Sequence, residues 1–495
     1  MSILETLRNF GRGQSLVKED KTVLFNDAMT EVEFLEKEIK AFLTSDKRRQ
    51  MIDGEAYYQG VHDVAEKVRT AIGENGQPEA IHNLPNNRVT YNTYANLVDQ
   101  KANYLLANPI EPQTDEEDFK EKVAAILDTA FDKRIRAIGV DALNCGIGYL
   151  LVYVADGELK YKRLKPYEVL PFWKDEEHEE LDAFIRIYGV EEYKGREKKT
   201  VQHVEYYTLD GVKYFIYTDA GKLEPDISRE DETYLTYKSA DGVKGFNWAR
   251  LPLIAFKYNA NEQPLLARVK SLQDALNDMV SGVLDRIQED SRNTILVVKN
   301  YGGTKADEFR HNLSQYGVVF VRTEDGAEGG VNTLQIEVNP GNYEIVIKLL
   351  KKAIIECGRG YDAKDDRLGG NANQLNIKSM YSDIDLDADS MQLEFSVALD
   401  RLLYFVGLVA DGFRVVKHKP VLWKFNRDII INEADTIANA RDSVGILSMR
   451  TIVANHPWTV DANDELRQIE KERAETIPAL EDYAKPTETG GNIEE

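Results

Sequence analysis

The sequence predicts an α+β fold on three observations. Residues 30–42 and 90–106 repeat apolar side chains at helical spacing. Residues 149–164 contain two strand-like runs joined by an Asp-Gly turn, which is typical of a β-hairpin. Residues 374–409 carry apolar side chains at steps of three or four throughout, which predicts one long amphipathic helix. With 495 residues, the chain has room for about two to four domains.

The composition indicates a globular, acidic protein. Apolar residues make up 42% of the chain and charged residues 30%, which excludes the disordered and collagen-like classes. The 85 Asp and Glu residues outnumber the 62 Lys and Arg residues, so the formal net charge is −23. A surface of that sign is not built to grip phosphate throughout, and we expect any nucleic acid to be held locally or weakly.

Targeting, membrane and disulfide features are not predicted. Glu5 and Arg8 interrupt the apolar region that a signal peptide would need. No stretch approaches the roughly 18 apolar residues of a membrane span. Cys145 and Cys357 lack the paired spacing of a zinc site and are too few for a disulfide framework. We therefore expect a soluble protein of a reducing, cytosolic compartment, without membrane contact.

The first 260 residues are predicted to form one mixed domain. Thr30 can cap the first helix, and an Asn-Pro pair ends the second. A third helix is expected over residues 118–145. After the hairpin, further strands are predicted at residues 184–188, 201–209 and 214–218.

The middle of the chain is predicted to run strand, helix, small insert, helix, loop and long helix. The strand covers residues 253–257, and helices at 264–291 and 342–357 flank the insert. Within the insert we expect strands at residues 295–299, 318–321 and 333–338 and a short helix at 305–313. The helix at 374–409 would be about 50 Å long at about 1.5 Å per residue, so it should need neighbours on more than one side.

The C-terminal part is predicted to be helical and then disordered. Helices are expected at residues 432–445, 448–455 and 461–474. Residues 461–495 hold 11 acidic and 4 basic side chains, and we expect the acidic tail at 477–495 to be disordered.

The sequence contains no recognisable motif for catalysis or for cofactor binding. The Gly221-Lys222 pair lacks the upstream Gly and the following Ser or Thr of a phosphate-binding loop. Three Gly-x-Gly fragments lack the third Gly of a dinucleotide fingerprint. The histidines form no His-Glu-x-x-His helix. We predict that the chain is not an enzyme and binds no cofactor and no metal.

Four carboxylates resemble a calcium loop of the EF-hand type. Asp383, Asp385, Asp387 and Glu394 match its positions 1, 3, 5 and 12. Position 6 needs Gly for a sharp turn but is Ala388, and the apolar pattern of a helix continues through the segment. On a helix the carboxylates would point in several directions, so we interpret them as a solvated face, with calcium binding as the alternative.

Three groups of side chains have both a structural and a functional interpretation. Three histidines lack a partner motif, and a surface or satisfied structural role is expected for His62, His82 and His456. Three lysines of one predicted helix fit either an exposed face or contact with nucleic acid: Lys348, Lys351 and Lys352. Three cations lie in a glycine-flanked loop, where binding residues often occur: Arg359, Lys364 and Arg367.

Four segments in a fixed order carry a family resemblance. They are NNRVTYNTYANLVDQKANYLLANPI at 86–110, CGIGYLLVYVADGELKYKRLKPYEVLPFW at 145–173, LPLIAFKYNANEQPLLARVKSLQDALNDMVS at 251–281 and SMRTIVANHPWTVDANDELRQIEKE at 448–472. Together they resemble the portal proteins of tailed double-stranded DNA bacteriophages, in particular the type found in phages of Gram-positive bacteria. The resemblance spans almost the whole chain.

The resemblance implies a portal fold with named parts. In chain order these are the N-terminal part of the wing at 1–260, a stem helix at 261–293, the clip at 294–340, a second stem helix at 341–357, the tunnel loop at 358–373, the long wing helix and a following strand at 374–430, the crown at 431–476 and the acidic tail at 477–495.

The resemblance also implies a function. Copies of the chain, usually twelve in this family, would form a ring-shaped channel at one capsid vertex, through which double-stranded DNA is packaged and ejected without sequence specificity. A separate terminase would use the ATP. Implied partners are the terminase large subunit, a head-completion or adaptor protein, and the major capsid and scaffolding proteins. The implied location is the virion, and the host cytoplasm during assembly.

Site residues follow from the same resemblance. The tunnel loop would present Arg359, Lys364, Asp365, Asp366 and Arg367 to DNA, and the stem would present Lys348, Lys351 and Lys352 to the channel. Docking residues of the clip would be Lys299, Lys305, Arg310 and Arg322. Two alternatives stay open: another head-tail structural protein, such as an adaptor or minor capsid protein without stem hairpin and clip, and a calcium-binding module.

Overall fold

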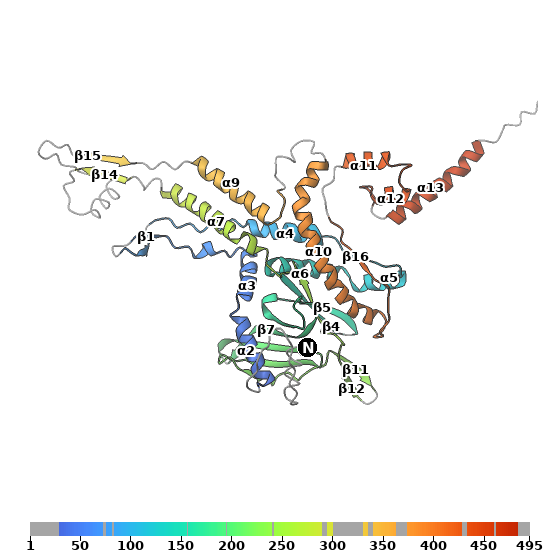
Figure 1. Ribbon diagram of the computed structural model, residues 1–495, viewed down its shortest axis with the longest axis horizontal. Helices are drawn as coiled ribbons and strands as arrows, with labels where there is room; N and C mark the ends of the chain where they lie inside the picture. Colours follow the sequence, from blue (N-terminus) through green and yellow to red (C-terminus); the bar gives the residue numbers. More distant parts are fainter. Residues whose placement is uncertain are drawn as a thin grey trace, which may run out of the picture. The chain divides into compact units, whose positions relative to one another are not determined.

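The chain forms two compact units, one of which mixes helices and sheets. The computed structural model describes residues 29–72, 76–81, 84–155, 157–194, 196–239, 242–289, 295–299, 330–334, 340–362, 374–427, 433–459 and 462–483. The first unit comprises Met1–Tyr361 and Asp383–Asp428, and the second comprises Asp362–Ser382 and Ile429–Glu495. The first unit combines several helices with a long run of strands in separate antiparallel sheets (Figure 1), which confirms the predicted α+β class.

A five-stranded antiparallel sheet has the order β10-β9-β8-β7-β6. Its strands are β6 Val169–Trp173, β7 Leu181–Lys194, β8 Glu197–Thr208, β9 Gly211–Tyr217 and β10 Leu223–Pro225. These strands confirm the three predicted after the hairpin. The first helix, α2 at Glu31–Leu43, buries Phe34, Leu35 and Ile39 in a cluster with Ile185 of β7. Burial of one apolar stripe of α2 against the sheet is what stabilises this helix.

A three-stranded sheet, in the order β13-β4-β5, contains the predicted hairpin. Its strands are β4 Ile147–Ala155, β5 Glu158–Leu164 and β13 Leu253–Lys257. Every residue of β13 is buried, as expected for a short apolar strand inside a core. Ile147, Tyr149 and Ala255 share one core cluster with Phe184 of β7, so side chains of both sheets pack together.

Four helices precede the three-stranded sheet in the chain: α3 Asp46–Tyr58, α4 Thr93–Leu106, α5 Glu117–Ile126 and α6 Thr129–Cys145. Helix α6 packs against β4, and α3 and α4 pack against α6. Helix α4 was predicted, whereas α3 was not. The prediction of one helix over 118–145 is wrong, because α5 ends at Ile126 and α6 starts anew at Thr129. The carboxylate of Asp128 accepts the backbone N–H of Phe131 at 2.9 Å and caps the second helix.

Helix α6 ends in a left-handed glycine. Gly146 has φ 82°, and a Cβ atom there would lie 2.0 Å from the carbonyl oxygen of Glu262. Only glycine meets both conditions. Cys145, the last residue of α6, is buried, whereas the second cysteine, Cys357, is exposed.

Helices α7, Leu266–Glu289, and α9, Pro340–Cys357, pack side by side (Figure 1). Both confirm the helices predicted on either side of an insert. Strands β14, Ile295–Lys299, and β15, Gly330–Leu334, pair antiparallel between them. The third predicted strand of the insert thus begins at Gly330 and not at residue 333, because pairing extends from Lys299 to that position. The helix predicted at 305–313 and the strand predicted at 318–321 lie outside the described residues.

The long helix is confirmed. Helix α10 runs from Gln374 to Ala410, and it buries Ile384, Met391 and Phe395 along one stripe. Beyond it, the short strand β16, Leu422–Lys424, pairs with β3, Glu111–Gln113. None of the helices in the described part of the chain combines the length and the apolar character that a membrane crossing requires.

The second unit contains α11 Glu433–Asp442, α12 Met449–Ala454 and α13 Ala462–Tyr483. These helices confirm the three predicted ones in place and order. Helix α13 extends to Tyr483, and disorder of the acidic tail at 477–495 stays a prediction. Acidic composition alone does not prevent a helix in which cations stand three or four residues away, as Arg467 does from Asp464 at 3.2 Å. Residues 484–495 lie outside the described residues.

The remaining elements are short. They are the 3-10 helices η1 Asp63–Glu66 and η2 Pro166–Glu168, and the antiparallel pairs β1 Thr70–Ile72 with β2 Pro78–Ala80 and β11 Leu235–Ser239 with β12 Gly242–Phe246.

Candidate functional site

Two of the three lysines predicted to face a channel are paired along α9 itself. Lys348 Nζ lies 2.6 Å from Glu344 Oε1, and Lys352 Nζ lies 3.6 Å from Glu356 Oε1. Both lysine side chains are 73% exposed. Exposed pairs at this spacing contribute little to stability. Helix α9 therefore presents these two cations to solvent next to neutralising carboxylates.

The third lysine packs inward. Lys351 Nζ lies 4.2 Å from the ring centroid of Tyr91, a cation-π contact with the segment that precedes α4. The three lysines predicted to face a channel thus differ in their surroundings. Lys348 and Lys352 share an exposed face of α9, whereas Lys351 contacts Tyr91.

Apolar side chains lie exposed on α9 and on the neighbouring helix α7. Ile345 and Leu349 of α9 are 66% and 64% exposed, and Ile287 of α7 is 62% exposed. Ile345 and Leu349 are one helical turn apart and so share a face. Ile345 and Leu349 therefore form a small exposed apolar pair on α9.

The opposite face of α7 is polar and buried. Four side chains one turn apart lie on it: Gln273, Asn277, Ser281 and Asp285. Their oxygens accept, in the same order, the backbone N–H groups of Tyr94, Tyr91, Val89 and Asn87 at 3.1, 2.9, 3.0 and 2.6 Å. Side chains thus supply the hydrogen bonds that these backbone groups need, both in the segment before α4 and, at Tyr94, in the first turn of α4. We call these four side chains the α7 ladder.

One predicted structural histidine belongs to the same interior. His62 is 2% exposed, its Nε2 lies 2.9 Å from the carbonyl oxygen of Tyr57, and its Nδ1 lies 2.8 Å from Asn277 Nδ2. Both ring nitrogens have partners, which confirms the satisfied structural role. His82 lies outside the described residues.

The chain leaves α9 through residues 358–361, which α4 holds in place. Arg359 has φ 52°, a left-handed conformation that is unfavourable for a residue with a side chain. The ammonium of Lys101 donates to the carbonyl oxygen of Arg359 at 2.9 Å. Gln100 binds both backbone groups of Tyr361, donating to its carbonyl at 2.8 Å and accepting its N–H at 3.0 Å.

Asp387 of α10 is 5% exposed and gathers four partners. Its Oδ2 accepts from Lys101 Nζ at 2.7 Å and from the hydroxyl of Tyr258 at 2.6 Å. Its Oδ1 accepts from Arg268 at 3.0 Å and lies 3.8 Å from the guanidinium of Arg359. We call these five residues the Asp387 cluster. It joins α4, the end of β13, α7, the exit of α9 and α10.

The electrostatics of the Asp387 cluster favour the charged form of Asp387 despite its burial. Burial acts to raise the pKa of Asp387, but Lys101, Tyr258 and Arg268 outweigh it, and the pKa is lowered. Burial lowers the pKa of Lys101 to about 8, against the opposing influence of Asp387. At neutral pH the carboxylate is therefore ionised and most Lys101 side chains carry their proton.

The segment that resembles a calcium loop is helical. Asp387 points into its cluster, whereas Asp385 accepts hydrogen bonds from Tyr104 and, at 3.3 Å, from Arg427. The interpretation as a solvated face is wrong for Asp387, because this side chain is buried. Helical phase places it beside Ile384 and Met391, a signal that the sequence contained. Among the described residues, no group of three His, Cys, Asp or Glu side chains is arranged to hold a metal ion.

The remaining predicted site residues are not tested by the structure. Lys299 ends β14, and its side chain is not described. The other tunnel-loop and clip residues lie outside the described residues: Lys364, Asp365, Asp366, Arg367, Lys305, Arg310 and Arg322.

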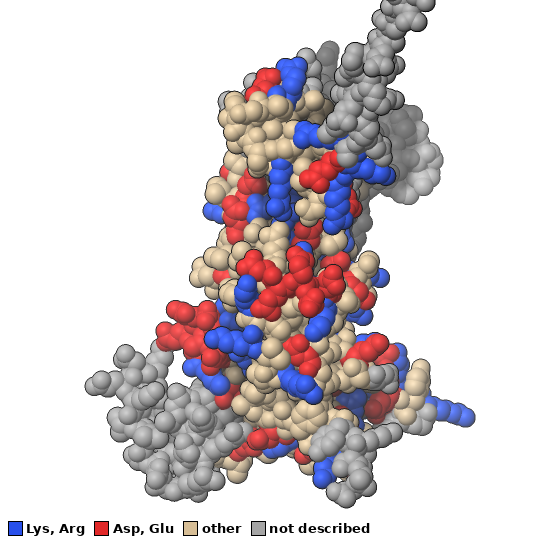
Figure 2. Space-filling view, turned by 90° about the vertical axis from the view of Figure 1, so that its right-hand side faces the viewer, with Lys and Arg blue, Asp and Glu red and all other residues tan. Residues whose placement is uncertain are grey.

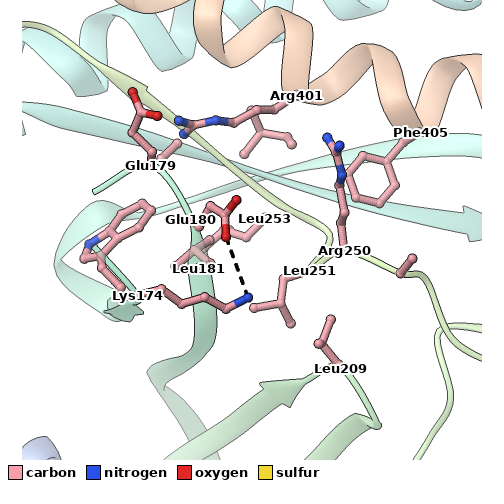
Figure 3. Close-up of a pocket in the computed structure, with 14 residues that line it drawn as sticks. Lys174, Glu179, Glu180, Leu181, Leu209, Arg250, Leu251, Leu253, Arg401 and Phe405 are labelled. Atoms are coloured by element: carbon pink, nitrogen blue, oxygen red, sulfur yellow. Dashed lines mark ion pairs between the residues drawn. The ribbon is translucent and has the colours of Figure 1, made fainter. Parts of the chain in front are cut away.

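A cavity of about 390 Å³ lies among the β6–β7 turn, β13 and α10 (Figure 3). Arg401 and Arg250 reach its edge near Glu179 and Phe405, and Lys174 lies 3.8 Å from Glu180. Among the described residues, its lining holds the charged side chains of Lys174, Glu179, Glu180, Arg250 and Arg401 beside apolar ones.

Comparisons with known proteins agree with the resemblance drawn from the sequence. A family model described as "Phage portal protein, SPP1 Gp6-like" matches residues 44–479. A "Portal protein" of Clostridium phage phiCD119 is 28% identical over 473 residues, which cover 91% of this chain and 99% of that protein. A "Portal protein" of Bacillus phage SPP1 is 26% identical over 431 residues, which cover 85% of this chain and 83% of that protein.

Proposed function

Because the chain belongs to the SPP1 Gp6-like family of phage portal proteins, we propose that it forms the ring-shaped channel at one vertex of a phage capsid. Double-stranded DNA passes through this channel during packaging and ejection. The chain itself catalyses no reaction, and a separate terminase hydrolyses the ATP. It resides in the virion after assembly in the host cytoplasm.

One observation carries the proposal of a ring. Large apolar side chains are exposed on α7, α9 and α10, where the described residues of a single chain leave them uncovered: Ile287, Ile345, Leu349, Leu386 and Leu393. Burying such a side chain contributes about 1.5–3 kcal/mol. Repeated around a closed ring, the same contact covers every copy and leaves no copy with an open end. We propose about twelve copies, the number that the resemblance implies.

The distribution of charge supports weak, sequence-independent contact with DNA. The net charge of one chain is −23. On the face drawn in Figure 2, basic and acidic side chains are interspersed, and a group of acidic ones lies near the middle. A channel of this sign repels the phosphate backbone, so DNA can slide in both directions without being held. The cations proposed to contact DNA in the tunnel loop and stem are Arg359, Lys364, Arg367, Lys348 and Lys352.

Docking partners follow from the same proposal. The segment between α7 and α9, with Lys299, Lys305, Arg310 and Arg322, would receive the terminase large subunit and later a head-completion or adaptor protein. The wing and crown would contact the major capsid and scaffolding proteins. The alternative of an adaptor or minor capsid protein is not retained, because the helical hairpin of α7 and α9 that we expect such a protein to lack is present.

Native mass and electron microscopy of the purified chain test the ring. We expect closed rings with a central pore and a mass near twelve times the 56.2 kDa of one chain. The measurement should cover several salt concentrations at micromolar protein, because copies of equal charge repel one another at low salt. A chain that stays monomeric under every condition, without a pore in any image, would refute the proposal.

A further inference from the structure

The exit of α9 adopts a backbone conformation that needs outside support. Arg359 is left-handed although it carries a side chain, and such residues persist only where the surroundings hold them. Gly358 and Gly360 leave no room for a side chain, since a Cβ atom at either would lie within 2.2 or 2.4 Å of Leu97. The turn therefore lies tightly on α4 and depends on the contacts that α4 makes.

A single ammonium group links this turn to α10. Lys101 Nζ donates one hydrogen bond to the Arg359 carbonyl at 2.9 Å and another to Asp387 Oδ2 at 2.7 Å. The side chain of Lys101 is 4% exposed, so water cannot replace either acceptor. Its charge is tolerated there because Asp387 lies opposite.

Asp387 holds more than one part of the junction. Arg268 of α7 and the hydroxyl of Tyr258 donate to the same carboxylate, and the Arg359 guanidinium approaches it from the turn. Removing the negative charge would leave the buried ammonium of Lys101 near two other cations, the partly exposed Arg268 and the half-exposed Arg359, without a carboxylate opposite it. Without the opposite charge, the buried ammonium of Lys101 would be destabilised, and its hydrogen bond to the Arg359 carbonyl would weaken.

We propose that Asp387 is a positioning residue, which through Lys101 fixes the backbone at residues 359–361 and so ties the C-terminal end of α9 to α10. The proposal rests on the proposed function in one respect: if the chain forms a channel, the fixed turn sets where the segment after α9 enters it. A movement of α9 would be transmitted to α10 through this cluster.

Hydrogen exchange of the full-length chain tests the positioning role. In Asp387→Asn, the amides of residues 355–361 should exchange at least about tenfold faster, because a charged hydrogen bond that held the turn is lost. Lys101→Met should give the same local increase, since it removes the link and keeps Asp387 paired with Arg268. Amides of β7 and β8 should keep their protection in both variants.

Asp385→Asn is the matched control. Asp385 lies two residues away on the same helix, but it binds Tyr104 and Arg427 and not the turn. We expect no faster exchange at residues 355–361 in this variant. Unchanged exchange there in a folded Asp387→Asn or Lys101→Met protein would overturn the proposal, as would equal acceleration in Asp385→Asn. If Asp387→Asn does not fold, Lys101→Met decides alone.

A second readout separates this inference from the proposed function. In phage particles, Asp387→Asn should leave ring formation intact and lower the amount of DNA retained, whereas Asp385→Asn should retain the wild-type amount. If the wild-type chain forms no ring, the proposed function fails and the exchange result still stands. If rings form and exchange is unchanged in the variants, the positioning role alone fails.

Discussion

Buried polar side chains in this protein bind the backbone of neighbouring segments. The α7 ladder binds four amides of residues 87–94, and Lys101 binds the carbonyl of Arg359. Helical spacing predicted the apolar stripe of α7, but polar residues at the same spacing are ordinarily expected to face solvent. Their burial depends on an extended segment about 190 residues earlier in the chain. The spacing of residues within α7 cannot reveal a partner that is so distant in the sequence.

His418 forms a pH-sensitive contact in the segment between α10 and β16. Its ring stacks on Phe119 at 3.6 Å, and its nitrogens lie 2.8 Å from Glu116 and 2.7 Å from Asp411. Burial opposes the charged form, but hydrogen bonds to Asp411 and Glu116 outweigh it and raise the pKa of His418 above 6.5. Lys122 and Lys419 stand nearby as partners of the carboxylates Asp411 and Asp115.

The sign of the pH effect follows from the raised pKa. The folded state binds the proton more tightly, so the stabilisation is complete below about pH 6.5 and is lost as pH rises through the raised value. Relative to His418→Gln, the wild type should be more stable by about 1–2 kcal/mol at pH 5.5 and by clearly less at pH 9. Thermal unfolding of both proteins at both pH values measures this. An equal difference at the two pH values would contradict it.

At the scale of elements, strong apolar periodicity predicted which segments are helices and where they lie, whereas capping residues determined where the helices begin and end. Helix α10 and the pair α7 and α9 carry long apolar stripes and were predicted within a few residues. The break between α5 and α6 was missed, because the apolar spacing continues across it and only Asp128 marks the new start. Helix α3 was missed because its first turn is charged and its apolar residues form no clear stripe.

Two left-handed glycines allow a matched test of one such boundary. Gly146 has φ 82° and Gly157 has φ 81°, but a Cβ atom at Gly146 would meet the carbonyl of Glu262 at 2.0 Å and one at Gly157 would meet nothing within 4 Å. Gly146→Ala should therefore lower stability by roughly 2–4 kcal/mol, and Gly157→Ala by about 1 kcal/mol from backbone strain alone. Denaturant unfolding compares the two. Equal losses would show that the clash at the α6–β4 junction is relieved.

At the scale of the whole molecule, the sequence predicted the family through four ordered segments, and the family model confirms it over residues 44–479. The assignment of wing, stem, clip and crown stays a prediction. The channel-facing side of α9 could not be predicted, because helical phase shows which residues share a face but not which face lines a channel. The subunit number could not be predicted either, because the rotation between neighbouring copies depends on how they pack.

The exposed apolar pair on α9 provides a test of assembly. Ile345→Glu with Leu349→Glu should abolish ring formation, because two charges per copy would have to be buried where apolar contact is expected. The monomer should keep its circular dichroism spectrum, since both side chains are more than 60% exposed. Lys348→Ala, on the same exposed side, is the control and should still form rings. Native mass measurement distinguishes them, and rings in the double variant would place the contact elsewhere.

The contrast between the two cysteines has a practical consequence. Cys145 is buried, and burial raises the pKa of its thiol, so it is a poor nucleophile, while Cys357 at the end of α9 is exposed. A maleimide fluorophore added to the folded chain would therefore attach once per copy, at one known place. Stepwise photobleaching of single labelled particles would then count the copies directly, and energy transfer between neighbouring dyes would report how far apart the ends of α9 lie.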